Sequence, residues 1–262
     1  MISTMTQYQL VNGNLDRSMR VVAADPIVER ETEYYLENIG DVKTIDEFLE
    51  DDRLFSFAMK AAGLSDMTYA KAFMRKVLEE GTDDRNAFAN RLADERYKDF
   101  AKTFNFVRYG EAATSFERAG QGVVDNYHRQ TLEENEGNTN DGVRLALYFT
   151  RKAPDISNVY EILADKALAQ VVYAALGLPD SFATADIDKQ AAYIENNIDL
   201  ADFQDPEKLD KFMQRFSAMY DMKNGLPLAT SPALQLISSA NTTVAIGQDL
   251  LTSIQTLKLG GL

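Results

Sequence analysis

The sequence predicts an all-α, multihelical protein in which an internal duplication gives two similar helical halves, flanked by terminal helices. Apolar side chains recur every three or four residues along most of the chain, and no stretch alternates as a strand would. Helix start and stop signals bracket these stretches. In addition, residues 34–64 align with residues 148–178 at a constant offset of 114. With 262 residues, 45% of them hydrophobic, the chain is long and apolar enough to build a large core.

The predicted order is an N-terminal helix (1–24), a first helical repeat (25–109), a connecting helix with a polar loop (110–141), a second repeat (142–225) and a C-terminal helix (226–262). These segments are compatible with one continuous domain. The N-terminal helix is predicted from one apolar stripe, formed by Val11, Leu15, Met19 and Val22.

The first repeat contains several helix boundaries. Asp25 before Pro26 is typical of a helix start, and Gly40 of the end of that helix. Thr44 to Glu47 reads as a capping box, and Gly63 as the residue after the helix end. Asp51-Asp52 indicates that the stretch between this capping box and Gly63 is divided into two helices. Further amphipathic helices are predicted within 68–80 and 93–106.

The connecting segment contains a polar run from Glu133 to Gly142, which predicts a loop or flexible linker. In the second repeat, Asp205-Pro206 repeats the helix-start signal, and the following helix is predicted to end at Gly225. Ser231-Pro232 then begins the C-terminal segment, in which apolar residues alternate in steps of three and four.

The duplication rests on identical residues at equivalent positions. The matches fall on predicted core faces and caps, where similarity between unrelated helices accounts for part of the agreement. They are Tyr34 with Tyr148, Asp41 with Asp155, Glu47 with Glu161, Leu49 with Leu163, Asp51 with Asp165, Leu54 with Leu168, Ala61 with Ala175 and Gly63-Leu64 with Gly177-Leu178. We therefore expect the two stretches to share one helix order.

Composition excludes several classes of protein. The net charge of −14 argues against nucleic-acid binding and against attraction to an anionic membrane. The absence of cysteine excludes disulfides, thiolate metal sites and thiol nucleophiles. No Sec signal peptide and no run of 18 apolar residues is found, so we expect no membrane insertion.

Catalytic and cofactor motifs are weak or incomplete. His128 is the only histidine, which leaves no His pair for a metal and fits a helix-surface or capping role. The polar run from Glu133 lacks the ligand spacing of a calcium loop in either register. Tyr148 and Lys152 have the spacing of the dehydrogenase Tyr-x-x-x-Lys pair, but the glycine-rich dinucleotide turn is missing. We predict no catalytic residues, no cofactor and no catalytic metal.

Several stretches resemble an uncharacterised bacterial family, domain of unknown function 1217. They are residues 25–28, 34–39, 51–60, 72–79, 88–94, 97–106 and 142–149. The resemblance implies a multihelical fold. Because genes of this family are often placed among flagellar genes, it also implies a link to flagellar assembly or structure. It carries no known catalytic residues.

The leading expectation, given this resemblance, is a non-enzymatic, flagellum-associated structural or interaction protein. We expect a protein partner, with a flagellar component as the candidate, and a cytoplasmic or flagellum-associated location. The predicted partner-binding residues form an apolar stripe with a seven-residue repeat in the C-terminal segment. They are Ile237, Val244, Leu251 and Ile254. Two alternatives stay open. One is a small-molecule binder or enzyme with a pocket between the two halves, and the other is a cytoplasmic chaperone or regulator of flagellar export. The sequence does not determine the oligomeric state.

Overall fold

The computed structural model describes residues 2–224, and every regular element in this part of the chain is helical. The predicted all-α, multihelical class is confirmed. The α-helices are α1 (Thr4–Asn12), α2 (Leu15–Ala23), α3 (Pro26–Ile39), α4 (Ile45–Glu50), α5 (Asp52–Ala61), α6 (Lys71–Glu80), α7 (Glu95–Thr103), α8 (Phe106–Tyr109), α9 (Gln121–Gly137), α10 (Asp141–Lys152), α11 (Val159–Ala164), α12 (Lys166–Ala175), α13 (Ile187–Asn197) and α14 (Pro206–Lys223). Short 3-10 helices are η1 (Ser65–Met67), η2 (Phe88–Arg91), η3 (Gly110–Ser115), η4 (Ala153–Asp155), η5 (Asp180–Thr184) and η6 (Leu200–Gln204).

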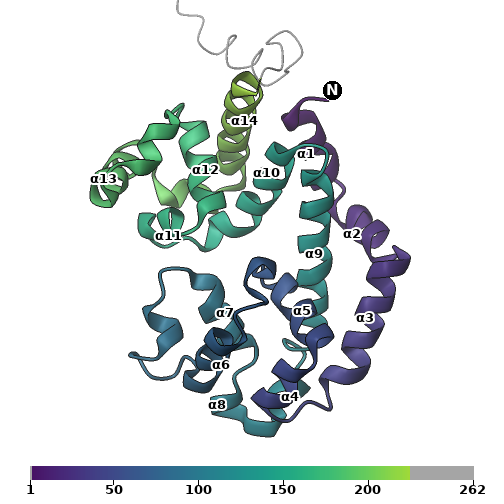
Figure 1. The fold of residues 1–262 in the computed structure, drawn as a ribbon. Helices are drawn as coiled ribbons and strands as arrows, with labels where there is room; N and C mark the ends of the chain where they lie inside the picture. The colour runs from purple at the N-terminus through teal and green to yellow at the C-terminus, as the bar shows by residue number, and fades with distance from the viewer. Residues whose placement is uncertain (1, 225–262) are drawn as a thin grey trace, which may run out of the picture.

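The helices form two lobes joined by α9 (Figure 1). The lower lobe consists of α3 to α8, and the upper lobe of α10 to α14 together with α1. Helix α9 packs on α5 in the lower lobe and on α10 in the upper lobe, while α2 packs along α9. Buried apolar side chains form one continuous cluster through both lobes, so the described chain has a single core.

The predicted helix starts are confirmed by their hydrogen bonds. The Asp25 side chain accepts from the backbone amides of the first turn of α3, and Pro26 occupies the first helical position. Thr44 and Glu47 make both bonds of the capping box at α4. Asp51 ends α4 and caps α5, so the acidic pair does divide this segment into two helices.

Gly63 and Gly177 end equivalent helices in the same way. Their φ angles are +70° and +69°, in the left-handed region that favours glycine. The amide of Leu64 donates to Met59, and that of Leu178 to Tyr173, at 2.8 and 2.9 Å. Both stops predicted from the sequence are therefore present with matching backbone conformations.

Two expectations are wrong. Residues 1–24 do not form one helix, because the chain breaks at Gly13 and Asn14 into α1 and α2. The polar run starting at Glu133 is also not a loop at its beginning, since α9 continues to Gly137 and leaves only residues 138–140 irregular. The physical reason is that Glu133 is buried, 1% exposed, and forms ion pairs with Arg129 and Arg151.

The order of helices is the same in the two stretches that align. Helices α3, α4, α5, α6 and α7 correspond in sequence to α10, α11, α12, α13 and α14. Their packing differs, because α5 packs chiefly on the connecting helix α9, whereas α12 packs on α14. The internal duplication therefore stays a prediction.

The first and last described helices are joined in the upper lobe, where α1 packs on α10 and α14. The buried carboxylate of Asp221 accepts hydrogen bonds from the Thr4 amide at 3.1 Å and from the Thr4 hydroxyl at 2.5 Å. Gly142 lies beside them, and its missing side chain leaves room for the ring of Tyr220. Within residues 2–224, no helix is long and apolar enough to cross a bilayer.

Candidate functional site

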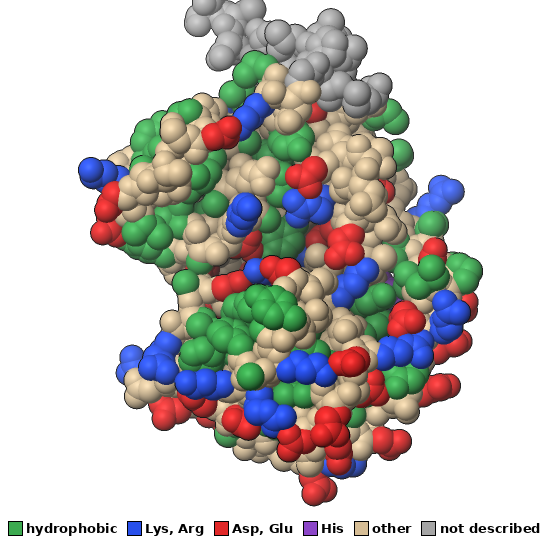
Figure 2. Space-filling model, in the orientation of Figure 1, with side chains coloured by type: hydrophobic (Ala, Val, Ile, Leu, Met, Phe, Trp, Pro, Cys, Tyr) green, Lys and Arg blue, Asp and Glu red, His purple; other side chains and the backbone are tan. Residues whose placement is uncertain are grey.

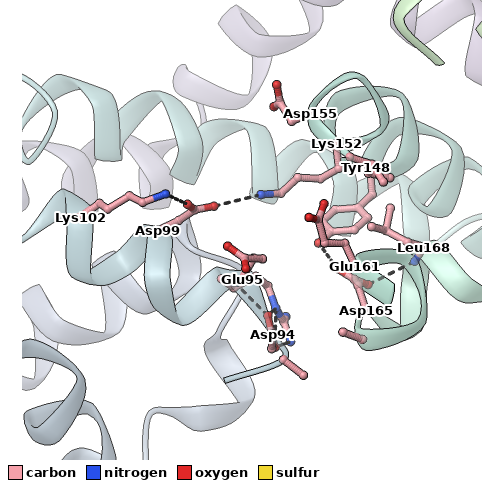
Figure 3. A pocket seen from close by; sticks show the side chains of 14 residues that line it. Asp94, Glu95, Asp99, Lys102, Tyr148, Lys152, Asp155, Glu161, Asp165 and Leu168 are labelled. Carbon is pink, nitrogen blue, oxygen red and sulfur yellow. Dashed lines mark hydrogen bonds and ion pairs between the residues drawn. The ribbon is translucent and has the colours of Figure 1, made fainter. Parts of the chain in front are cut away.

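A cleft of about 310 Å³ lies between the two lobes. Its lower wall is α7 and the residues just before it, and its upper wall comes from α10, η4, α11 and α12. Figure 2 shows the hollow between the lobes, and Figure 3 shows its charged lining. The polar side chains that line it are Asp94, Glu95, Arg96, Asp99, Lys102, Tyr148, Lys152, Asp155, Glu161 and Asp165.

Arg96 organises the lower wall. The Asp94 carboxylate caps α7 by accepting from the Arg96 amide, and it also accepts from Nη2 of the same residue at 2.7 Å. The other terminal nitrogen, Nη1, donates to the Gly63 carbonyl at 2.5 Å. The guanidinium thus ties the start of α7 to the end of α5, and its donors are engaged within the lower lobe.

Tyr148 and Asp165 organise the upper wall. The Tyr148 hydroxyl donates to the Asp165 carboxylate at 2.5 Å, while the other carboxylate oxygen caps α12. Burial, the charge of Asp165 and this hydrogen bond raise the pKa of Tyr148 well above its ordinary value. Tyr148 is therefore a neutral donor at physiological pH.

Asp99 connects the two walls. Its carboxylate lies 3.3 Å from the ammonium of Lys102 on the same helix and 3.7 Å from that of Lys152 on α10 (Figure 3). All three side chains are partly exposed, and pairs of this kind contribute at most about 1 kcal/mol. The ion pair between Asp99 and Lys152 therefore contributes little to holding the two lobes together.

The cleft does not reproduce the dehydrogenase pair suggested by spacing alone. Tyr148 and Lys152 both line it, but the Lys152 ammonium is directed to Asp99, and the pKa of Tyr148 is raised rather than lowered. Activation of the tyrosine as a base would require the opposite shift. The exposed carboxylates leave the cleft suited to binding by ion pairs and hydrogen bonds.

His128 lies away from the cleft, on α9. Its Nε2 is 3.1 Å from the Thr32 hydroxyl of α3, and burial lowers the pKa of His128 below its ordinary value. The predicted place on a helix surface is thus correct, but the ring is half-buried at a helix contact. Among the described residues, no group of three or more His, Cys, Asp or Glu side chains is arranged to hold a metal ion.

Two apolar grooves flank the last turn of α14, and sequence reasoning did not find either. We call the first the α12–α14 groove; it has a volume of about 570 Å³ and lies between α12, η5, α13 and α14. The second, the α1–α14 groove, has about 500 Å³ and is lined by α1, the end of α9 and α14. Tyr220 and Asn224 line both grooves. No pattern in the sequence predicts these grooves, because their walls come from distant parts of the chain that meet only in the folded protein.

The predicted partner-binding residues Ile237, Val244, Leu251 and Ile254 lie outside the described residues. Their chain continues from Asn224, where both grooves meet. The C-terminal segment therefore begins at a residue that lines both grooves.

Comparison with known proteins places the chain in a family. Residues 61–209 match the model of the family described as Protein of unknown function (DUF1217). The chain belongs to this family. Both walls of the inter-lobe cleft lie within the part that matches the DUF1217 model. The resemblance expected from the sequence is thereby confirmed.

A solved structure extends the comparison beyond the DUF1217 match. The chain is similar to protein AGR_C_984 from Agrobacterium tumefaciens, known from an X-ray crystal structure, with 52% sequence identity and a TM-score of 0.79. The similarity covers 86% of this chain and 97% of that chain. Among curated proteins, none matches the sequence.

Proposed function

We propose that this DUF1217 protein is a non-enzymatic, flagellum-associated structural or interaction protein. The observation that carries the proposal is the meeting of two apolar grooves at Tyr220 and Asn224, just before the apolar stripe of the C-terminal segment. Concave apolar surfaces and seven-residue apolar repeats are both features of helix-mediated association. The flagellar part rests on the placement of the family's genes.

The inter-lobe cleft supports the same proposal. Its prominent polar groups already bind one another, with Arg96 on Asp94, Tyr148 on Asp165 and Lys152 on Asp99. Such pairs hold helices in place. An acid-base centre would instead need a titratable group with its pKa shifted towards neutrality.

The stripe is tested by charging it in motile cells. Leu251→Asp with Ile254→Asp places two carboxylates on the stripe, and Thr252→Asp with Ser253→Asp places the same charges between stripe positions. We expect the first pair alone to reduce motility, with the melting temperature of the purified protein unchanged. Equal motility of both variants, or a collapse of stability in the first one, overturns the proposal.

The partner is tested by affinity purification and mass spectrometry with the same variants. We expect a flagellar component to be recovered with the wild type and with the control pair, and to be lost with the stripe pair. A partner set that is identical for all three proteins contradicts a role for the stripe. The same preparations, from cells and from detached flagella, distinguish a cytoplasmic chaperone or regulator of export from a protein that leaves the cell.

A second candidate is a small-molecule binder, because the cleft brings charged side chains from both sequence halves to one polar hollow. A thermal-shift screen of charged metabolites tests it. A shift that is lost in Lys152→Gln and kept in Lys60→Gln, a lysine paired with Glu134 on α9, supports this function. A screen in which no compound shifts either protein rejects it.

A further inference from the structure

Beside the inter-lobe cleft lies a smaller chamber of about 120 Å³, which we call the α9–α10 chamber. It shares Tyr148 and Lys152 with the cleft and extends from them to the end of α5. Space is left there because Ala58, Ala61 and Ala62 line it with nothing larger than methyl groups. The volume corresponds to about four water molecules, so the chamber fits a small ion and is too small for a nucleotide.

The lining of the chamber is positive, although the protein as a whole is acidic. Its charged side chains are three cations and one carboxylate, in a chain whose net charge is −14. They are Arg96, Arg151, Lys152 and Asp99. Arg96 is paired with Asp94 at 2.7 Å, which leaves Arg151 and Lys152 as the cations available to a ligand. A concave site with an excess of one sign of charge attracts ligands of the other sign.

Nearby carboxylates neutralise these two cations only in part. Arg151 pairs with Glu133 at 2.8 Å, but the same carboxylate also pairs with Arg129 at 2.9 Å. One negative charge is thus shared by two guanidinium groups. The ammonium of Lys152 lies 3.7 Å from the Asp99 carboxylate, which is beyond hydrogen-bonding distance. An anion in the chamber therefore compensates positive charge that the surrounding side chains leave in excess.

Unused hydrogen-bond donors line the same chamber. The side-chain amides of Asn126 and Gln130, both on α9, donate to no residue in the described part of the chain. The Nη1 atom of Arg151 likewise has no partner among residues 2–224, because its ion pair with Glu133 uses Nε and Nη2. An oxyanion accepts several hydrogen bonds at once, from neutral and from charged donors. The donor set of the chamber matches this requirement.

The adjoining cleft has the opposite balance of charge. Its lining contains three cations and six carboxylates, which are Asp94, Glu95, Asp99, Asp155, Glu161 and Asp165. These carboxylates repel an anion from the cleft. The α9–α10 chamber, with a single carboxylate, is therefore the more favourable place for an anion between the lobes.

We propose that the α9–α10 chamber binds a small oxyanion with the size and charge of inorganic phosphate. Arg151 and Lys152 supply the positive charge, and Asn126 and Gln130 supply neutral donors. The buried ring of Phe100 forms part of the wall, and an apolar wall strengthens the attraction between charges beside it. The donors lie on α9 and α10 and the wall on α5 and α7, so a bound anion contacts both lobes. The site is additional to the partner surface of the proposed function.

Isothermal titration calorimetry with inorganic phosphate, at constant ionic strength, tests the site on the purified full-length chain. Asn126→Asp puts a carboxylate in the chamber, and Asn135→Asp puts the same charge on an exposed position further along α9. We expect one saturable site in the wild type and in Asn135→Asp, and binding at least about tenfold weaker in Asn126→Asp, because like charges repel. No saturable binding to the wild type, or equal affinities in all three proteins, overturns the proposal.

Side-chain NMR locates the bound anion. The amide signals of Asn126 and Gln130 should shift with phosphate and not with chloride at equal ionic strength, and unshifted signals contradict binding in the chamber. Ala62→Leu tests the site without a change of charge, because the longer side chain fills the chamber. Wild-type affinity in this variant also overturns the proposal. Neither Asn126 nor Gln130 lines the inter-lobe cleft, and no flagellar partner is present, so the result is independent of both functions considered above.

Discussion

Tyr148 holds Asp165 with a hydrogen bond of 2.5 Å, which ties α10 to the first turn of α12. The same relationship joins Tyr34 of α3 to Asp51 at the start of α5, at 2.8 Å. Both tyrosines and both aspartates are related by the offset of 114 residues. In each lobe, therefore, one carboxylate caps a helix and is anchored by a phenol from an earlier helix.

Removal of the Tyr148 hydroxyl should be costly. Tyr148 is 8% exposed, and a hydrogen bond to a charged group contributes about 1.5–3 kcal/mol, so we expect Tyr148→Phe to lower the free energy of unfolding by that amount. Urea denaturation measures it. Tyr34→Phe is the control and should cost less, because its hydroxyl is partly exposed to solvent. Equal losses in both variants would contradict the role assigned to burial.

Glu133 should be among the most sensitive charged residues. Its carboxylate accepts from Arg129 and Arg151, and Glu133→Ala leaves the charge of the nearly buried Arg129 without its carboxylate partner. Such a loss costs about 3–5 kcal/mol. The next residue provides the control: Glu134→Ala breaks a half-exposed pair with Lys60 and should cost less than about 1 kcal/mol. Chemical denaturation that ranks Glu134→Ala first would refute this account.

Two Gly→Ala substitutions should have opposite effects. A methyl group on Gly142 would lie 2.6 Å from the Tyr220 ring and 2.9 Å from Thr4, so Gly142→Ala should destabilise the protein by about 1–3 kcal/mol. Gly40 has nothing within 4 Å and a φ of −66°, and Gly40→Ala should stabilise by about 0.4–1 kcal/mol. Differential scanning calorimetry of both variants gives the signs. A more stable Gly142→Ala protein would mean that α1 is not packed as described.

His128 should make the protein less stable in weak acid. Burial lowers the pKa of His128 in the folded protein, so the unfolded chain binds the proton more tightly. The contribution of this residue is present above the ordinary pKa of about 6.5 and is lost as the pH falls through the lower folded pKa. Because there is one histidine, its NMR titration is unambiguous, and the midpoint should lie below 6.5. His128→Gln should remove this part of the pH dependence.

Local signals in the sequence predicted the helix boundaries well. Asp25, Thr44 and Asp51 act through bonds to residues two or three positions away, and Gly63 through its own backbone angle. Interactions of this range are encoded in short stretches and are largely independent of the rest of the fold. Short sequence patterns are therefore sufficient to predict these helix boundaries.

Long-range relationships could not be predicted in the same way. Glu133 lies in a run that looks solvated, and only the approach of Arg151 from α10 makes its burial favourable. The cleft and both grooves likewise depend on how separate helices pack, which no short-range spacing specifies. The spacing of Tyr148 and Lys152 shows the limit most clearly, because their actual partners are Asp165 and Asp99.

The bond between Thr4 and Asp221 joins positions 217 residues apart and has a consequence for biosynthesis. At about 5–20 residues per second, roughly 10–40 s pass between synthesis of the two residues. Helix α1 has nine residues, too few to be stable alone, and Met5, Tyr8 and Val11 stay without their burial partners during this time. Helix α1 thus leaves the ribosome well before it can pack, and the upper lobe closes only when α14 has been made.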